Sequence, residues 1–597
     1  MSRGVLSAAW SLWRTSLRQD RRKAVTALVL VVAGAVAWPL VALMLRVLFE
    51  AANAGRPVAA SLAGVAVAVL LIAGLTLGHF AHIAYFELSE LDVLHLHQDL
   101  MEATNGSPGM AHYERPELAD KVAVLEEDVE QLRVGLQAVL TGVGLAVAMA
   151  LTTVVLASLD PVLLLLPLVA VPPLLAGRWA ERMVDRARES SAESTRRALG
   201  LFRLATQAAA GRELRVFGLE AEVRRRHRLL WQGSTRRLWR TQSAASLVRM
   251  SGQLAFAAGY VAAVLLILRD AVAGRRGAGD VILVVTIAAQ VNQQVAAAVG
   301  ALQDLQRLRS VYQRLDEVHE LIRAGGPPSA TAGPPPPTRL RDGIRLADVT
   351  LRYPGAERPV LAGLDLRLPA GATVAIVGDN GAGKTTLVKL LCGLLRPTGG
   401  RILVDGTELG ELSLPAWRAR IAAGFQDFVR FELPAGRTVG LGDLPRRDDE
   451  PAVRTALDRA GAGDVVDALE AGLATQLGTS YADGVELSGG QWQKLALGRA
   501  FMRDEPLLVV LDEPAAALDA EAEHALFERY RQQAARVAAR TGAVSVFVSH
   551  RFSTVQLADL IVVLADGRVA ELGTHADLLA AGGRYAEMFE LQAGAYR

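Results

Sequence analysis

The chain has 597 residues, too many for one compact domain at about 150 residues per domain. Its mean hydropathy is +0.26 and 51% of its residues are hydrophobic, and the apolar excess lies in the first half of the sequence. The 64 basic and 62 acidic residues give a net charge of +2, which argues against a polyanionic partner such as nucleic acid. The single cysteine, Cys392, excludes a disulfide within the chain and a cysteine-ligated metal site.

Uncharged apolar runs recur through the first half of the chain. Each is long enough to cross a membrane, which takes about 17 to 25 residues, the fourth only just. Buried helices of a soluble core would carry charges on one face every turn or two, and these runs lack them. A basic segment, 1–23, precedes them and is expected to form a helix on the membrane surface. We therefore predict six membrane spans, at 24–45, 57–86, 134–159, 161–177, 250–268 and 281–303.

Basic residues flank the predicted spans unevenly, and this bias sets the orientation. The N-terminus is basic and the segment 178–249 is rich in arginine, so we expect both to lie in the cytoplasm. Arg269, Arg275 and Arg276, between the fifth and sixth spans, break the rule locally. The pattern predicts a multi-pass protein of the cytoplasmic membrane, with its N-terminus and its C-terminal domain on the cytoplasmic side.

Two long stretches between spans, 87–133 and 178–249, have helical periodicity and very little proline or glycine. At about 1.5 Å per residue they would extend the spans far beyond the bilayer as paired helical rods. Each stretch is interrupted near its middle. The interruptions predict a short cross-helix at the tip of each rod pair, around 113–118 and around 213–218.

Polar residues occur in two of the predicted spans. His79 and His82 lie at the cytoplasmic end of the second span, near the water boundary, which favours a structural or interfacial role for them. Four amide side chains, Gln290, Asn292, Gln293 and Gln294, crowd the middle of the sixth span. Such groups are costly in lipid and should face the bundle interior, where they either line a substrate path or join helices by hydrogen bonds. The sequence leaves both interpretations open.

A segment rich in glycine and proline, 324–338, divides the chain. Residues 378–386 beyond it read GDNGAGKTT, between a β-branched run and a helix-like run. This order of strand, glycine loop and helix forms a phosphate cradle, because the backbone N–H groups turn toward the anion and the helix start adds its dipole. Lys384 is expected to reach the β- and γ-phosphates, and the Thr385 hydroxyl is expected to bind Mg²⁺. We predict a site for ATP and magnesium.

Two further buried strands are predicted by the continuous apolar run 507–511 and by the largely apolar run 544–549. Ligand groups gather at the carboxyl ends of parallel strands. The first run ends in Asp512 and Glu513. Asp512 suits the magnesium shell, and Glu513 suits the general base that orients the attacking water. The second run ends in His550.

Two other segments fit the same kind of site. Residues 487–491, LSGGQ, open a predicted helix and form a second anion-binding loop. Tyr353 ends a strand-like run that begins at Ile344. Taken alone, Tyr353 is better interpreted as a residue packed at the strand end than as one that stacks on a purine.

Together these segments closely resemble the ATP-binding cassette (ABC) transporters. The segment 378–386 resembles the Walker A loop of that family, 487–491 resembles its signature, and the strand that ends in Asp512 and Glu513 resembles its Walker B strand. Six spans before a C-terminal ATPase resemble an exporter-type half-transporter, so the resemblance covers nearly the whole chain. It implies an α-helical transmembrane domain over 1–323, a linker over 324–338 and an α/β phosphate-loop ATPase domain over 339–597.

The resemblance also implies roles for individual residues. His550 matches the switch histidine of the family, and Gln426 matches its Q-loop glutamine. Asp519 matches the aspartate of its D-loop. Tyr353 matches the aromatic residue that stacks on adenine, and this match reverses the interpretation that Tyr353 receives when it is taken alone. Catalytic roles are implied for Glu513, His550 and Gln426, and magnesium binding for Thr385, Gln426 and Asp512. The nucleotide-binding set comprises Tyr353, Gly378, Asn380, Gly381, Gly383, Lys384, Thr385, Thr386, Ser488, Gly489, Gly490, Gln491 and Asp519.

In that family two ATPase domains close head to tail, and each ATP lies between the Walker A loop of one and the signature of the other. The resemblance implies that Ser488 and Gly490 contact the γ-phosphate of ATP held by a second chain, either a second copy or a homologous half-transporter. Because Glu513 and the signature are intact, a homodimer would be catalytically self-sufficient. The cross-helices around 113–118 and 213–218 match the coupling helices of the family. The segments 479–486 and 516–519 depart from its common patterns.

The sequence thus predicts ATP-driven export of a hydrophobic, amphipathic or peptide-like substrate across the membrane. Two alternatives remain: an exporter-shaped importer of siderophore-like cargo, and a lipid-translocating ATPase. A protein that acts on nucleic acid is excluded by the spans and the net charge. An exporter that also cleaves leader peptides is disfavoured, because Cys392 is the only cysteine.

Overall fold

The structure, a computed structural model, describes residues 4–106, 109–110, 113–115, 117–118, 121–122, 124–125, 129, 131–159, 161–162, 169, 171–324, 333–514, 520–549 and 551–595. Its internal contacts divide the chain into two compact units. The helical unit contains residues 1–100 and 123–317. The sheet unit contains residues 101–122 and 318–597, so a short segment of the first half belongs with the second. The predicted domain boundaries stay predictions.

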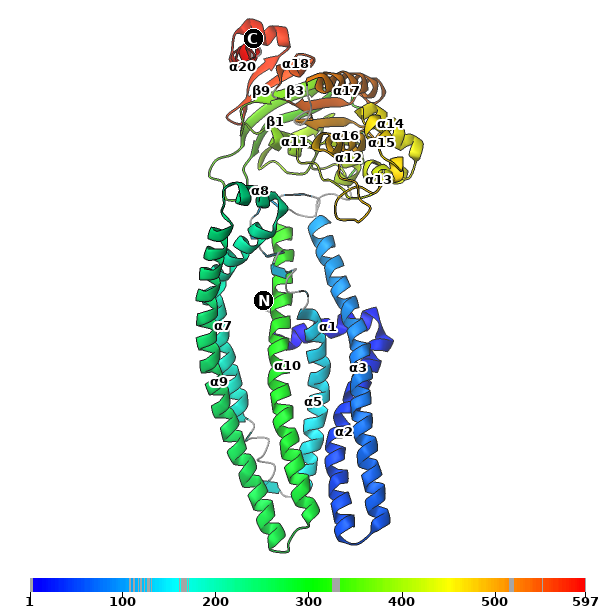
Figure 1. Cartoon of the computed structure of the whole chain (residues 1–597). Coiled ribbons are helices and arrows are strands. Elements are labelled where there is room, and N and C mark those ends of the chain that lie inside the picture. Colours follow the sequence, from blue (N-terminus) through cyan, green and yellow to red (C-terminus); the bar gives the residue numbers. More distant parts are fainter. Residues whose placement is uncertain are drawn as a thin grey trace. The chain divides into compact units, whose positions relative to one another are not determined.

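Long helices make up the helical unit (Figure 1). Asp20 separates the first two helices and caps the second, because its Oδ1 accepts hydrogen bonds from the N–H groups of Arg22 and Lys23, both at 3.0 Å. Two helices, α3 and α10, continue past the unit into the segments assigned to the sheet unit. The helices are α1 Val5–Gln19, α2 Arg21–Asn53, α3 Pro57–Asn105, α5 Gln131–Leu159, α7 Val171–Thr206, α8 Ala208–Val216, α9 Glu220–Val272 and α10 Ala278–Ala324.

Five of the described helices, α2, α3, α5, α9 and α10, are long and apolar enough to span a membrane. They match the first, second, third, fifth and sixth predicted spans. The fourth predicted span, 161–177, falls partly outside the described residues, and α7 begins within it at Val171. Only a minority of the most apolar window of each helix is buried by the described residues, which leaves apolar surface available for contact with lipid.

The rods predicted for 178–249 are α7 and α9, which lie side by side (Figure 1). Arg249 of α9 pairs with Glu181 of α7 at 3.2 Å, and the hydroxyl groups of Thr195 and Ser234 are 3.1 Å apart. Between the rods lies the predicted cross-helix, α8. Val216 ends α8 with 78% of its surface exposed. The cross-helix predicted around 113–118 lies partly outside the described residues.

The amide side chains of the sixth span join helices. Gln290 Nε2 donates to the backbone oxygen of Trp38 at 2.8 Å, next to Pro39, which interrupts the hydrogen-bond ladder of α2. Gln294 Nε2 donates to the Thr152 hydroxyl at 3.2 Å. Of the two interpretations left open by the sequence, these contacts support interhelical hydrogen bonding for Gln290 and Gln294.

Two of the three arginines that break the charge bias have local partners. Arg275 and Arg276 both pair with Asp270, and Arg276 Nη1 also donates to the backbone oxygen of Leu159 at 2.9 Å. Because Leu159 ends α5, Arg276 satisfies a carbonyl at a helix terminus. Arg276 therefore joins the end of α5 to Asp270 near the end of α9, which gives it a structural role in addition to any effect on orientation.

The sheet unit contains two sheets. One is antiparallel, with strand order β2-β1-β4-β5, and the other has the order β10-β9-β3-β8-β7-β6, in which every pair from β9 to β6 is parallel. Strands β7 and β8 are buried at every position, as their apolar runs predict. The strands are β1 Gly343–Leu351, β2 Leu361–Pro369, β3 Thr373–Gly378, β4 Gly399–Val404, β5 Thr407–Glu408, β6 Ile421–Gly424, β7 Leu508–Asp512, β8 Val544–Val548, β9 Leu560–Ala565 and β10 Arg568–Gly573.

Helices pack against the strands and form two core clusters with them. Tyr530 and Phe547 pack edge to face in one core cluster, and Trp417 is fully buried in the other. Trp417 Nε1 donates to the backbone oxygen of Leu391 at 3.0 Å, which satisfies a carbonyl at the end of α11. The helices are α11 Lys384–Leu391, α12 Leu414–Arg418, α13 Ala435–Gly440, α14 Glu450–Ala460, α15 Gly463–Asp467, α16 Gly489–Ala500, α17 Ala520–Thr541, α18 Phe552–Val555, α19 His575–Ala581 and α20 Arg584–Ala595.

Candidate active site

Four neighbouring parallel strands, β3, β8, β7 and β6, end at one edge of the large sheet. The phosphate loop follows β3, Glu513 follows β7, and Gln426 lies two residues beyond the end of β6. Ligands bind to open α/β sheets at the carboxyl ends of their strands. The sheet order therefore brings to one edge three segments that are far apart in the sequence.

The phosphate loop has the strand, loop and helix arrangement that its sequence predicts. It leaves β3 at Gly378 and enters α11 at Lys384. Gly383 caps that helix with φ +99°, and a side chain there would lie 2.7 Å from Leu361 Cδ2, so only glycine fits. Lys384 Nζ donates to the backbone oxygens of Gly378 at 2.8 Å and Asp379 at 3.0 Å. The ammonium group therefore lies over the loop that would hold the phosphates.

Tyr353 lies beside the start of the same helix. Its hydroxyl is 3.2 Å from the Thr386 hydroxyl, and it packs against the core cluster that contains β3 and α11. This places an aromatic ring next to the phosphate loop, as the proposed stacking on adenine requires.

The residues proposed to bind magnesium fit a hard, oxygen-preferring cation. Asp512 is 2% exposed, and burial raises its pKa while a hydrogen bond from Thr385 opposes that shift. Within the described residues, Asp512 Oδ1 is buried without a hydrogen-bond partner. Such an atom is costly unless a ligand satisfies it. Together with the Thr385 hydroxyl it offers the few oxygen ligands with which proteins hold Mg²⁺, the phosphates supplying others.

Glu513 and Gln426 are brought together by the sheet. Gln426 Nε2 donates to Glu513 Oε2 at 2.9 Å. Glu513 has φ +48°, a left-handed conformation that costs a non-glycine residue of order 1 to 3 kcal/mol and is concentrated at functional sites. The backbone N–H of Glu513 donates a hydrogen bond to the backbone oxygen of Val548, in the neighbouring strand, at 3.1 Å. Glu513 is thus held at the strand end by its backbone hydrogen bond to Val548, and its carboxylate is held by the amide of Gln426.

The LSGGQ segment forms the N-terminus of α16. Ser488 is the N-cap, and it forms a capping box with Gln491, with hydrogen bonds of 2.9 Å and 3.3 Å. Ser488 and Gly489 are exposed, so the first-turn N–H groups of α16 can receive an anion. Within the described part of the chain, no hydrogen bond joins this segment to the phosphate loop.

Two predicted site residues cannot be placed. His550 and Asp519 lie outside the described residues. Conversely, sequence reasoning missed Gln493, which is buried and whose Nε2 donates to the backbone oxygen of Pro514 at 2.7 Å. Gln493 ties the helix that begins with the signature to the turn after Glu513, and nothing in the local sequence pattern marks this role.

A segment from the first half of the chain contacts the helix that follows the phosphate loop. Glu114 Oε1 pairs with Lys389 Nζ at 2.7 Å, and the N–H of Met110 donates to the backbone oxygen of Leu394 at 2.8 Å. Lys389 lies in the last turn of α11, whose first turn carries Lys384 and Thr385. One short helix therefore links the phosphate loop to this segment.

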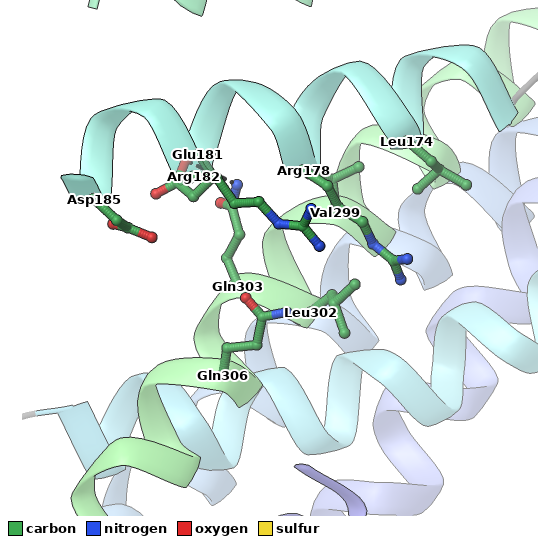
Figure 2. Close-up of a pocket in the computed structure, with 9 residues that line it drawn as sticks. All are labelled: Leu174, Arg178, Glu181, Arg182, Asp185, Val299, Leu302, Gln303 and Gln306. Atoms are coloured by element: carbon green, nitrogen blue, oxygen red, sulfur yellow. Dashed lines mark hydrogen bonds between the residues drawn. The ribbon is translucent and has the colours of Figure 1, made fainter. Parts of the chain in front are cut away.

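A cavity of about 250 Å³ lies between α7 and α10 in the helical unit. Figure 2 shows the side chains of Arg178 and Arg182 reaching from α7 toward α10. Glu181, which also lines the cavity, accepts hydrogen bonds from Gln303 and Arg249, both at 3.2 Å. Within the described residues, neither Arg178 nor Arg182 forms a hydrogen bond or an ion pair. The cavity is therefore lined by two guanidinium groups that form no direct ion pair within the described residues, together with the carboxylates of Glu181 and Asp185.

Known proteins resemble this chain in sequence and in fold. The family model described as ABC transporter matches residues 361–516. A relative from Xylella fastidiosa, an "ATP-dependent lipid A-core flippase", is 32% identical over 431 residues, which is 72% of this chain and 70% of the relative. The chain belongs to the ABC transporter family. A relative of the same name from Cupriavidus pinatubonensis is 42% identical over 255 residues, but this covers only 42% of its length, so less than half of that relative is matched.

Among solved structures, a bacterial Atm1-family ABC exporter with ATP bound matches with a TM-score of 0.79. The match covers 96% of this chain and 98% of that one, at 23% sequence identity. The ABC transporter therefore has an exporter-type fold, a helical membrane domain followed by an α/β ATPase domain, as the sequence predicts.

Proposed function

We propose that this chain is one half of a homodimeric transporter that uses ATP to export an amphipathic substrate across the cytoplasmic membrane. The proposal depends mainly on one observation: the phosphate loop, Gln426, Asp512 and Glu513 meet at one edge of the large sheet. The same chain contains five described helices that are long and apolar enough to span a membrane. The excess of basic residues in the N-terminus and in 178–249 supports a cytoplasmic position for both and for the ATPase domain.

Each residue has a chemical task in this proposal. Lys384 and the loop N–H groups bind and orient the phosphates. Glu513 accepts the proton of the attacking water, and Gln426 holds its carboxylate in place. Thr385, Asp512 and Gln426 would hold magnesium, which supplies charge neutralisation on the phosphates when bound. His550 and Asp519 keep the roles that the family resemblance implies for them, as switch histidine and D-loop aspartate.

The site is proposed to be completed by a second copy. The exposed N-terminus of α16, with Ser488 and Gly490, is suited to receive the γ-phosphate of ATP bound to the other chain. Closure would then pull on the 101–122 segment through Lys389 and Glu114. This is how ATP would drive alternating access.

Vesicles that contain the purified protein test the direction of transport. With the ATPase domain outside, ATP should drive uptake of an amphipathic dye into the vesicle, which corresponds to export from the cell. ATP-driven release of preloaded dye from the same vesicles would instead support an importer.

Lipid translocation is a second candidate, and the cavity between α7 and α10 favours it. Two relatives are named ATP-dependent lipid A-core flippases, and the two unpaired arginines suit the acidic headgroup of an amphiphile.

The double variant Arg178→Ala/Arg182→Ala tests this second candidate. Because each charge-assisted hydrogen bond contributes about 1.5 to 3 kcal/mol, the concentration of acidic lipid that half-maximally stimulates ATP hydrolysis should rise roughly tenfold or more. Phosphatidylglycerol and phosphatidylcholine are compared in nanodiscs. Arg186→Ala, on the same helix but outside the cavity, is the matched control and should behave as wild type. Equal stimulation of the double variant and wild type would rule out this binding role.

A further inference from the structure

The phosphate loop contains an acidic side chain at its second position. Asp379 is 62% exposed at its side chain and lies between Gly378 and Asn380, in a loop whose N–H groups and lysine are arranged for an anion. A carboxylate so close to the phosphates repels them, and the repulsion is only partly screened by water. An uncompensated Asp379 would therefore oppose the binding that the rest of the loop favours.

The carboxylate is compensated from the far end of the chain. Arg584 Nη2 donates to Asp379 Oδ2 in an ion pair between residues 205 positions apart in sequence. Arg584 is the first residue of α20, the last helix of the sheet unit (Figure 1). Lys384, by contrast, is directed at the backbone oxygens of the loop. The two cations thus act on different groups, Arg584 on the acidic side chain and Lys384 on the loop backbone.

The position of Arg584 is fixed by the strand beside it. Glu571 of β10 accepts a hydrogen bond from the N–H of Arg584 at 2.5 Å and one from the N–H of Tyr585 at 3.0 Å. A carboxylate at this place satisfies N–H groups at the start of α20 and complements the helix dipole. A Cβ at Gly583 would lie 2.3 Å from Glu571 Oε1, so a larger residue there would displace the carboxylate from the two N–H groups that it accepts from.

The helix is also anchored by its core. Tyr585 is fully buried, its hydroxyl lies 2.7 Å from His575 Nδ1, and its ring packs edge to face on Phe552. The start of α20 is therefore fixed in the core of the sheet unit, and this fixes the position of Arg584 next to the phosphate loop.

We propose that Arg584 is a positioning residue that neutralises Asp379 and so sets the affinity of the phosphate loop for nucleoside di- and triphosphates. It makes α20 a part of the nucleotide site, so that a displacement of this helix lowers nucleotide affinity without any change in the loop itself. The inference rests on the proposed function, since it requires that the loop binds ATP.

A double-mutant cycle on the full chain in nanodiscs tests the proposal, with the dissociation constant for trinitrophenyl-ATP as the readout. An exposed charge pair contributes an interaction free energy of up to about 1 kcal/mol. Arg584→Gln should therefore weaken the binding of trinitrophenyl-ATP by about fivefold at low salt. The single variant Asp379→Asn should bind the nucleotide with wild-type affinity or more tightly. The double variant Asp379→Asn/Arg584→Gln should have the same nucleotide affinity as the single variant Asp379→Asn. The loss in Arg584→Gln should shrink in 1 M salt, where the Debye length is about 3 Å.

Two further variants complete the design. Arg568→Gln, on the neighbouring strand β10, removes an exposed arginine for which the described residues show no partner, and it should leave affinity unchanged. Arg584→Lys keeps the charge and should stay within about twofold of wild type.

The proposal is overturned if Arg584→Gln binds as wild type, if it causes the same loss in the Asp379→Asn background, or if Arg584→Lys loses as much as Arg584→Gln. The second result would mean that Arg584 acts through the phosphates or the fold and not through Asp379. Failure of the wild-type protein to bind the nucleotide would instead refute the proposed function itself, so the two failures are distinguishable.

Discussion

The variant Glu513→Gln should bind ATP with wild-type affinity, hydrolyse it roughly a hundredfold to ten-thousandfold more slowly, and accumulate as a closed dimer with ATP trapped inside. Glutamine has the shape of glutamate and can keep the hydrogen bond to Gln426, but it cannot accept the proton of the attacking water. The rate range is that of one general base. Single-turnover hydrolysis, together with nucleotide retention on a spin column, measures both effects.

The matched control for this variant is Glu505→Gln. Glu505 pairs with Arg540 at 2.7 Å, its side chain is 57% exposed, and it belongs to no proposed part of the site. Wild-type hydrolysis is expected in the control. Turnover of Glu513→Gln within a few-fold of wild type would remove Glu513 from the role of general base.

The second large effect is expected for Lys384→Ala. The ammonium group is the only side-chain cation of the phosphate loop, and its loss removes charge-assisted hydrogen bonds worth about 1.5 to 3 kcal/mol each. We expect nucleotide affinity to fall roughly ten- to hundredfold and hydrolysis to become undetectable. Isothermal titration with ATP and a phosphate-release assay check the two parts.

Lys494→Ala serves as the control for Lys384→Ala, because Lys494 forms a surface pair with Asp464 at 2.7 Å and should affect hydrolysis little. An unchanged rate in Lys384→Ala would contradict the assignment of residues 378–386 as the phosphate site.

Local patterns were sufficient to predict the elements of the site. The order of strand, glycine loop and helix around 378–386 is written in consecutive residues, and the apolar runs before Asp512 and His550 are typical of strands buried on both faces. The structure confirms β3, α11, β7 and β8 at these places. Five of the six predicted spans also appear as described helices, because length and apolarity alone identify a membrane helix.

Contacts between distant segments could not be predicted in the same way. The order β3-β8-β7-β6 depends on which strands pair, and strand pairing leaves no local periodicity. The hydrogen bond between Gln426 and Glu513 follows from that order, and without the family resemblance nothing marks Gln426. The pair of Glu114 with Lys389 joins residues 275 positions apart, at the ends of segments whose own sequences carry no sign of it.

The central claim is that each ATP site is built from two chains, and a mixed dimer tests it most directly. One chain carries Lys384→Ala and the other carries Ser488→Ala, and two different affinity tags isolate the dimer that contains one of each. This dimer keeps one site with an intact phosphate loop and an intact signature, although neither chain has both. We predict that it hydrolyses ATP well above the level of either variant homodimer, whereas hydrolysis no higher than in those homodimers would contradict a site shared between two chains.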